Sequence, residues 1–169
     1  MRLRLRALRA EDEREALAAQ DELRPEGFTF LLGWEPGMAW SEYLLKRERH
    51  RRGLDLTPPW VASTFLVAEV DGALVGRISI RHELSDYLAE AGGHIGYAVR
   101  PHFRRRGYAT EILRQGLLVA RSLGIEAVLV TCDEGNCASA RVIERLGGVL
   151  EDVREDPRGG PRKRRYWIA

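Results

Sequence analysis

Chemistry in this chain is concentrated in a basic, glycine-containing loop between Val99 and Thr110. Three consecutive arginines, Arg104 to Arg106, stand directly before Gly107. Backbone N–H groups at a helix N-terminus are unpaired and the helix dipole adds partial positive charge, so such a position binds anions. Glycine lets the backbone approach a ligand, and arginine donates charge-assisted hydrogen bonds to phosphate. The segment predicts a phosphate or pyrophosphate site; the alternative is a capped helix with solvated arginines.

The elements on either side of this loop are predicted from hydrophobic periodicity. His94 to Val99 is an apolar strand, and Ala109 begins a helix whose apolar residues recur at helical spacing until Gly124. A buried strand at Ala127 to Cys132 and a short helix at Ala138 to Leu146 follow. The loop therefore joins a strand to a helix that lies on the sheet.

Two hairpins and two further helices complete the predicted fold. Asp71 and Gly72, between two apolar runs rich in β-branched residues, are a strong signal for a tight hairpin. The remaining predicted elements are a strand at Leu3 to Leu8, helices from Glu11 to Leu23 and from Met38 to Arg52, the hairpin strands Thr64 to Val70 and Ala73 to His82, and a final hairpin of Val149 to Glu155 with Arg164 to Ile168. This order indicates a mixed α+β fold.

Length and composition limit the possible classes of protein. The 169 residues suit one domain spanning residues 1–169. Apolar residues make up 44% and charged residues 31%, which excludes a disordered chain and a membrane protein. The net charge of +2 is too small to indicate a nucleic-acid partner. With no long apolar run and no signal peptide, we expect a cytoplasmic protein that does not bind membranes.

The two cysteines, Cys132 and Cys137, suit a reducing compartment. No second cysteine or histidine pair stands near them in the sequence. We therefore expect free thiols and no metal site.

The basic loop and a later segment match two motifs of a known superfamily. Arg104, Gly107 and Ala109 follow an acetyl-CoA motif in which Arg or Gln is followed after two residues by Gly and, two positions later, by Gly or Ala. Asn136, 27 residues after Ala109, and Ser139 match an Asn-x-x-Ser/Ala segment that precedes a helix ending in Leu-Gly. The chain thus resembles the GCN5-related N-acetyltransferase (GNAT) superfamily.

The resemblance is detailed from about Leu66 onward and rests on element order before that. Within the superfamily, the runs Ile80 to His82, Gly92 to Tyr97 and Tyr166 to Ile168 look most like bacterial predicted acetyltransferases of unassigned substrate. It implies a mostly antiparallel seven-stranded sheet with helices on both faces. It also implies transfer of the acetyl group of acetyl-CoA to a primary amine by direct attack in a ternary complex.

The resemblance further implies which residues hold acetyl-CoA. The strands His94 to Val99 and Ala127 to Cys132 would splay apart, with the pantetheine arm between them and the thioester carbonyl polarised by backbone of the first. The loop amides would bind the pyrophosphate, while Arg104 to Arg106 would contact the ribose 3′-phosphate or remain in water. The implied cofactor-binding set is Tyr97, Ala98, Val99, Arg104, Arg105, Arg106, Gly107, Tyr108, Ala109, Thr110, Asn136 and Ser139.

Direct transfer needs a neutral amine, donors for the developing oxyanion and a proton for the thiolate. Many relatives place a tyrosine acid one turn beyond Ser139, where this chain has Ile143. We predict His94 as the base because its near-neutral pKa suits the task; His82 is the second candidate, and a structural histidine is the alternative. Ser139 is predicted to return a proton to the CoA thiolate or else to bond main chain.

Other features carry weaker expectations. An acyl-cysteine at Cys132 or Cys137 is less favoured than direct attack. The aromatic residues around the second helix are expected to plug the core rather than line an acceptor pocket; they are Phe28, Phe30, Trp34 and Trp60. The basic tail from Arg158 to Arg165 is interpreted as a solvated hairpin.

Two functions besides acetyl transfer stay open. Ile143 in place of an acid would suit a non-catalytic acyl-CoA-binding or regulatory domain. The arginine clusters alone would suit a nucleic-acid-binding module. The sequence leaves the acceptor amine and the length of the acyl group undetermined, and it leaves a homodimer through the final hairpin as an alternative to a monomer.

Overall fold

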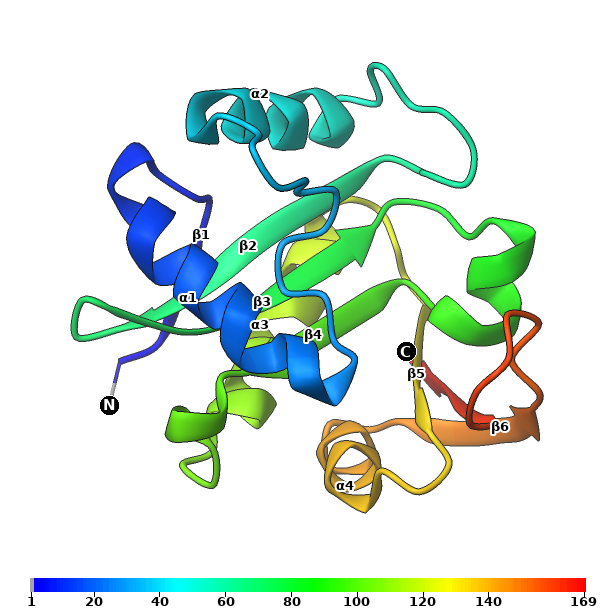
Figure 1. The fold of residues 1–169 in the computed structure, drawn as a ribbon. Helices are drawn as coiled ribbons and strands as arrows, with labels where there is room; N and C mark the ends of the chain where they lie inside the picture. Colours follow the sequence, from blue (N-terminus) through cyan, green and yellow to red (C-terminus); the bar gives the residue numbers. More distant parts are fainter. Residues whose placement is uncertain (1) are drawn as a thin grey trace.

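The computed structural model describes residues 2–169 as an open sheet with helices against both faces (Figure 1). The strands are β1 (Arg4–Arg6), β2 (Ser63–Val70), β3 (Ala73–Arg81), β4 (Ile95–Val99), β5 (Val128–Asp133), β6 (Val149–Arg154) and β7 (Lys163–Ile168). The main helices are α1 (Glu13–Leu23), α2 (Trp40–Arg51), α3 (Tyr108–Ser122) and α4 (Cys137–Arg145). The predicted order of strands and helices is confirmed.

Pairing of the strands gives the predicted mixed sheet. Within residues 2–169 seven strands follow the order β1-β2-β3-β4-β5-β7-β6, and β4 with β5 is the one parallel pair. Both predicted hairpins form. In the first, Asp71 and Gly72 have φ of 49° and 82°, the two positive values that a type I′ turn requires.

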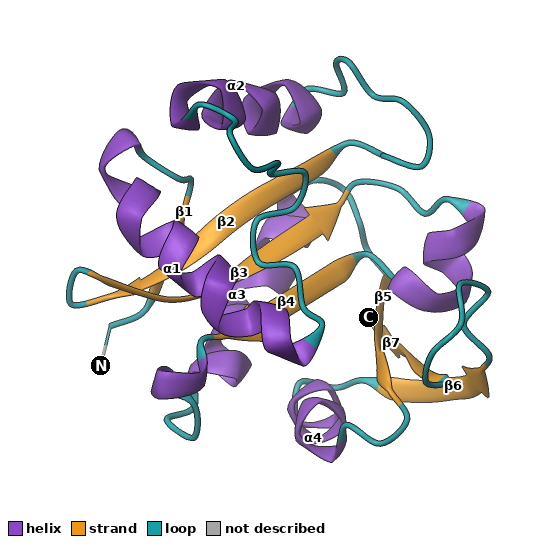
Figure 2. Cartoon of the chain, viewed as in Figure 1, coloured by secondary structure: helices purple, strands orange, loops and turns teal. Residues whose placement is uncertain are grey.

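The helices form one layer on each face of the sheet (Figure 2). α1 and α2 bury a core that includes Leu23, Phe30 and Tyr43. α3 and α4 cover the opposite face around Ile112 and Ile143. The apolar stripe of α3 lies on the sheet as its periodicity predicts. Since the centre of the sheet is covered on both faces, the place where strands part becomes the natural site for a ligand.

β4 and β5 diverge directly after they meet. In the described part of the chain they share the single pair Ile95–Val130. Pairing in an antiparallel ladder alternates along a strand, and the bonds from Arg100 N–H and to the His94 carbonyl both involve β3. Even-numbered residues of β4 therefore face β3, while the backbone groups of Tyr97 and Val99 face the gap.

The chain enters β4 through a turn to which no predicted element corresponds. Leu88–Gly92 forms one π-helical turn and leads into Gly93, whose φ is 68°. A Cβ on Gly93 would lie 2.6 Å from the Leu129 carbonyl oxygen. Glycine is needed here, and His94 lies just before β4 instead of inside it.

Gly76 on β3 is a position where an added side chain would collide with the backbone of β4. Its Cβ would overlap the carbonyl oxygen of Ala98 on β4. We expect Gly76→Ala to lower the free energy of unfolding in urea by about 1–3 kcal/mol through overpacking. In Gly135→Ala the new methyl group meets nothing within 4 Å, so this control should change stability by less than about 0.5 kcal/mol. Equal stabilities of the two variants would contradict the close approach.

Candidate active site

A cavity of about 880 Å³ opens where β4 and β5 part. It extends from the N-terminus of α3, along β4, to the first turn of α4 and the segment between α1 and α2. Its lining contains most of the residues singled out from the sequence: Tyr97, Ala98, Val99, Arg104, Arg105, Gly107, Tyr108, Ala109, Thr110, Asn136 and Ser139. The fold thus brings the basic loop, the splayed strand and the Asn136 segment to one site.

The basic loop turns its backbone toward this cavity. Arg105 and Gly107 both have positive φ, 64° and 81°, and Gly107 is the N-cap of α3. These left-handed residues direct successive N–H groups to one side of the chain, as in other anion-binding loops. A Cβ on Gly107 would meet nothing within 4 Å, so open space lies in front of the first amides of α3.

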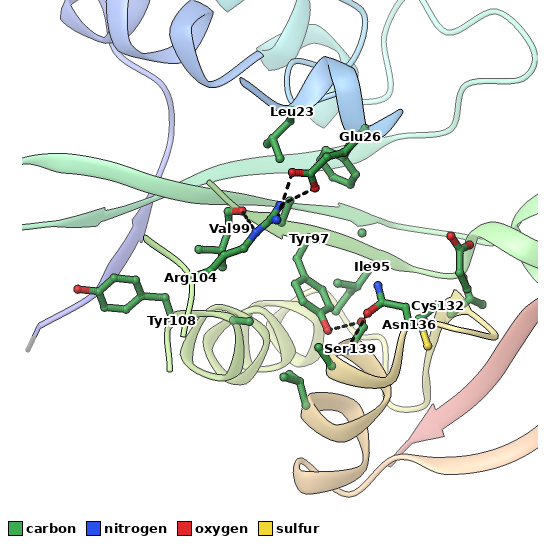
Figure 3. Close-up of a pocket in the computed structure, with 18 of the residues that line it drawn as sticks. Leu23, Glu26, Ile95, Tyr97, Val99, Arg104, Tyr108, Cys132, Asn136 and Ser139 are labelled. Carbon is green, nitrogen blue, oxygen red and sulfur yellow. Dashed lines mark hydrogen bonds and ion pairs between the residues drawn. The ribbon is translucent and has the colours of Figure 1, made fainter. Parts of the chain in front are cut away.

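The three arginines of the loop have different surroundings. Arg104 donates from Nε to the Val99 carbonyl at 3.2 Å and pairs with both Glu26 oxygens at 3.2 and 2.7 Å (Figure 3). Arg106 lies over the Phe103 ring, 5.8 Å from its centroid, and does not line the cavity. Arg105, which lines the cavity, is exposed to solvent. Arg104 therefore holds the loop against β4 and the α1–α2 segment.

A tyrosine on β4 and a serine on α4 meet across the gap. The hydroxyls of Tyr97 and Ser139 share a hydrogen bond of 2.8 Å (Figure 3). Asn136 caps α4 by accepting from the Ser139 N–H at 3.1 Å, which fixes the serine. Burial raises the pKa of Tyr97 to about 12, so its hydroxyl keeps its proton at neutral pH. The sequence analysis used only the main chain of Tyr97 and missed this side chain.

His94 and His82 are bonded to neighbouring strands. The Leu129 N–H donates to Nδ1 of His94 at 2.9 Å, and the His94 N–H donates to the Leu129 carbonyl at 2.7 Å. His94 is buried and is not among the residues lining the cavity; burial, then the charge of Arg81, lowers its pKa. His82 Nε2 bonds Thr64 Oγ1 at 2.8 Å, and burial lowers its pKa as well.

The two cysteines are neutral thiols, and Ile143 is apolar. Cys132 lines the cavity, but burial raises the pKa of its thiol to about 11, which leaves little thiolate. Cys137 is exposed. Ile143, on α4, is fully buried in the core, so no hydroxyl stands where many relatives carry the tyrosine acid. Direct attack therefore remains simpler than an acyl-cysteine.

The aromatic residues near α2 divide between core and cavity. Phe30 is fully buried. Trp34 packs against Tyr43 with ring centroids 5.5 Å apart. Trp60 is partly exposed beside His50. Phe28, in contrast, lines the cavity, so it is the member of this set that an incoming molecule would touch.

Two arginines on β3, the buried Arg77 and the half-buried Arg81, complete the site and were missed as site residues. Arg81 lines the cavity, and Arg77 lies behind it with its guanidinium 4.4 Å from the Phe28 ring centroid. The available signal was a charged residue repeated within an otherwise apolar strand. A charged residue within such a strand needs a hydrogen-bonding or charged partner, or else has a functional role.

The described residues form neither a metal-binding cluster nor a helix that could cross a membrane. Residues 2–169 hold no group of three or more His, Cys, Asp or Glu side chains arranged to bind a metal ion. None of the helices they form combines the length and the hydropathy needed to cross a bilayer.

Comparison with protein families now gives this site a context. A family model described as an acetyltransferase (GNAT) domain matches residues 2–149. The chain belongs to the GNAT acetyltransferase family. It is therefore, by class, an acetyl-CoA-dependent acyltransferase. Comparison with curated proteins gives no match.

Solved acetyltransferase structures share the fold at low sequence identity. An acetyltransferase of the GNAT family from Streptococcus pneumoniae has a TM-score of 0.70 and 17% identity, with 99% of this chain and 98% of that one covered. Ribosomal-protein-S5-alanine acetyltransferase from Vibrio fischeri scores 0.68 at 17% identity, with 98% and 92% covered. The protein yncA of Salmonella typhimurium, solved with its cofactor acetyl-CoA, scores 0.65 at 16%, with 98% and 92% covered. At these identities the likeness shows the fold.

Proposed function

We propose that the protein transfers the acetyl group of acetyl-CoA to a primary amine by direct attack in a ternary complex. The observation that carries the proposal is the cavity in which the unpaired edge of β4 adjoins the anion-binding N-terminus of α3. The unpaired backbone of β4 can hydrogen-bond the amides of a pantetheine arm, and the N-terminus of α3 can bind a pyrophosphate. The structure of the acetyltransferase yncA, solved with its cofactor acetyl-CoA, supports this choice of cosubstrate.

In this proposal each part of the cofactor has its own partners. Backbone N–H groups from Arg105 to Thr110 bind the pyrophosphate, and the solvent-exposed Arg105 adds charge. The backbone groups of Tyr97 and the N–H of Val99 bind the arm, and the N–H groups donate to the thioester oxygen; the Val99 carbonyl accepts from Arg104. Asn136 and Ser139 border the arm from α4.

We expect Gly107→Glu to abolish acetyl-CoA binding, because it puts bulk and negative charge where the pyrophosphate is proposed to lie. Isothermal titration with acetyl-CoA and with ADP measures this. Gly72→Glu is the matched control, since Gly72 has nearly the same φ, 82° against 81°, and equally open surroundings, but lies in the β2–β3 turn. Gly107→Glu binding acetyl-CoA as well as the control does would refute the pyrophosphate assignment.

The chemistry requires one bond to form and one to break. The amine nitrogen attacks the thioester carbon, the carbonyl oxygen gains negative charge, and the C–S bond then breaks to give CoA thiolate. Fixed backbone donors on β4 stabilise the charged oxygen. Tyr97, through or beside Ser139, gives its proton to the thiolate and takes the place of the tyrosine that many relatives carry near Ile143.

Tyr97→Phe is expected to lower kcat by about 100-fold and to leave acetyl-CoA affinity unchanged, because the ring stays and only the hydroxyl is lost. Steady-state CoA release and calorimetry measure the two quantities. With the pKa of Tyr97 at about 12, the acid stays protonated and the wild-type rate should not decline from about pH 7 to about pH 9. Tyr43→Phe, which loses a buried hydroxyl bonded to the Leu32 carbonyl, is the control; an equal loss in both variants would exclude Tyr97 as the acid.

His94 remains the predicted base. Because the Leu129 N–H donates to Nδ1, the neutral ring carries its proton on Nε2, and His94 could take a second proton only at Nδ1, by giving up this hydrogen bond. His94→Asn keeps a hydrogen-bond acceptor near Nδ1 and removes the basic ring. We expect this variant to lower kcat without changing acetyl-CoA affinity; wild-type kcat and an unaltered pH profile would show a structural histidine instead.

A non-catalytic acyl-CoA-binding domain is the second candidate, and the buried Ile143 is the observation in its favour. Saturable acetyl-CoA binding with no CoA release on a broad amine panel would select it. The free cysteines agree with the cytoplasm as the proposed location. Val149 and Leu150 are exposed on the edge strand β6, and a homodimer through this edge stays a prediction.

A further inference from the structure

Three polar residues of β3 gather over one glycine of β4. Arg77, Ser79 and Arg81 alternate along β3 and therefore share one face of the sheet, and Ser79 pairs directly with Gly96. A Cβ on Gly96 would lie 3.3 Å and 3.5 Å from the Nη1 and Nη2 atoms of Arg81, and 3.7 Å from Nη1 of Arg77. Both guanidinium groups thus converge on the point where Gly96 lines the cavity.

Neither guanidinium has a carboxylate partner among the described residues. Arg77 donates to the carbonyl oxygens of Phe30, Gly96 and Thr29 at 3.1, 3.0 and 2.5 Å. Arg81 donates from Nη1 to the Gly92 and Gly93 carbonyls at 3.2 and 3.5 Å. The dipoles of carbonyl groups satisfy N–H donors but do not neutralise the two positive charges.

Three other buried or half-buried arginines of this chain have carboxylate partners. Arg6 pairs with Asp12 and Glu69, Arg100 with Glu15 and Glu22, and Arg165 with Glu151 and Asp152. Two acids accompany each of these arginines. Arg47 on α2, which does not line the cavity, is likewise buried without an acid and bonds His50 instead. Among the described residues that line the cavity, Arg81 is thus a cation with no carboxylate to neutralise it, and burying an unpaired charge is costly.

Two further observations point to a missing anion. The hydroxyl of Ser79, between the two arginines, is buried and has no hydrogen-bond partner in the described structure. Burial lowers the pKa of Arg77 to about 9 and that of Arg81 to about 10, as expected for cations without counter-charges. Arg81 is the group a ligand can reach, because Arg77 is only 3% exposed.

This cationic cluster, defined as Arg77, Ser79 and Arg81, lies beside the proposed reaction centre. Gly96 is adjacent to Tyr97, whose free backbone is proposed to hold the thioester. The anion-binding N-terminus of α3 is a separate part of the cavity, next to Gly107. Phosphates of CoA therefore have their own partners, and an anion at the cluster belongs to the other substrate.

We propose that the acceptor is a small α-amino acid whose carboxylate is bound by Arg81. This inference rests on the proposed acetyl transfer and names its substrate class. Because the cluster meets β4 where the acyl group lies, the carboxylate and the amine must be on the same or neighbouring carbons. A polyamine, a lysine side chain and a peptide N-terminus carry no anion at that distance.

The cluster also affects the reacting nitrogen. Positive charge nearby disfavours an ammonium ion and so lowers the pKa of the bound amine. The neutral nitrogen forms the C–N bond, its surplus proton passes to water or the predicted base, and the C–S bond breaks to release CoA. A strong protein base is then less necessary.

The first test compares acceptors that differ only in the carboxylate. CoA release by the wild-type enzyme is measured with the common L-amino acids, with their amides, and with spermidine and a tetrapeptide as the remaining classes. We expect at least one free amino acid to exceed its amide by about 100-fold in kcat/KM. Amides, spermidine or the tetrapeptide serving as well as the free acids would overturn the proposal.

The second test changes the arginine. Arg81→Gln should raise KM for the preferred amino acid, leave the rate with its amide unchanged, and leave acetyl-CoA affinity unchanged; Arg81→Lys should restore part of the loss. Arg4→Gln, at an exposed arginine on the edge strand β1, is the control. An equal effect on acid and amide would show that Arg81 only supports the Gly92 turn.

Binding without turnover separates this proposal from the proposed function. The complex of the wild-type protein with CoA is titrated with the same amino acids and amides. Binding of an acid but not of its amide supports the carboxylate site even if turnover is slow, and binding of neither overturns it. Failure to bind acetyl-CoA itself would instead refute the proposed function.

Discussion

The parting of β4 from β5 is the constraint on which the site depends. Parallel neighbours in a sheet normally share a continuous ladder, which satisfies the backbone groups of both strands. Here the described ladder consists of the pair Ile95–Val130, and the strands then lead to different helices. The separation leaves polar backbone without protein partners inside the molecule, and it sets the width of the space between α3 and α4.

Several interactions keep the two strands apart and fixed. Thr131 donates to the Ala91 carbonyl at 2.5 Å, which anchors β5 to the turn before β4. The Tyr97–Ser139 bond spans the opening from the other face. Arg165, held by two acids, also donates to the Ala89 carbonyl. The opening is therefore braced at both ends by side chains, which preorganises the site before a ligand enters.

The residues that the sequence could identify are those whose role is local. The start of α3, the basic loop before it and the start of α4 after Asn136 depend on neighbours within a few positions, and they lie within a residue or so of where the sequence predicts them. The fold order followed from turns such as Asp71-Gly72 for the same reason. Strand ends moved by a residue or two where a tertiary contact, such as Gly93 against Leu129, decided the boundary.

Residues that act through distant partners could not be identified in this way. The hydroxyl of Tyr97 acquires its role from Ser139, 42 positions away, and Arg104 from Glu26, 78 positions away. Arg77 and Arg81 can be identified as site residues only from the structure, which places no described carboxylate beside either guanidinium. Periodicity gives the face of a strand that a residue occupies, but it does not give the charge of what packs against that face.

The Arg104–Glu26 pair gives the two substrates a way to affect each other's binding. It ties the loop at the start of α3 to the segment between α1 and α2, and both its side chains are about 43–44% exposed, so the contact can exchange with solvent or with a ligand. A polyanion arriving at the loop competes with Glu26 for the same guanidinium. Thermodynamic linkage makes such an effect reciprocal. If nucleotide binding changes how well the α1–α2 segment is ordered, a molecule that orders this segment changes the nucleotide's affinity by the same free energy. The affinities of the two substrates would then be coupled through one surface ion pair, before both are bound at β4.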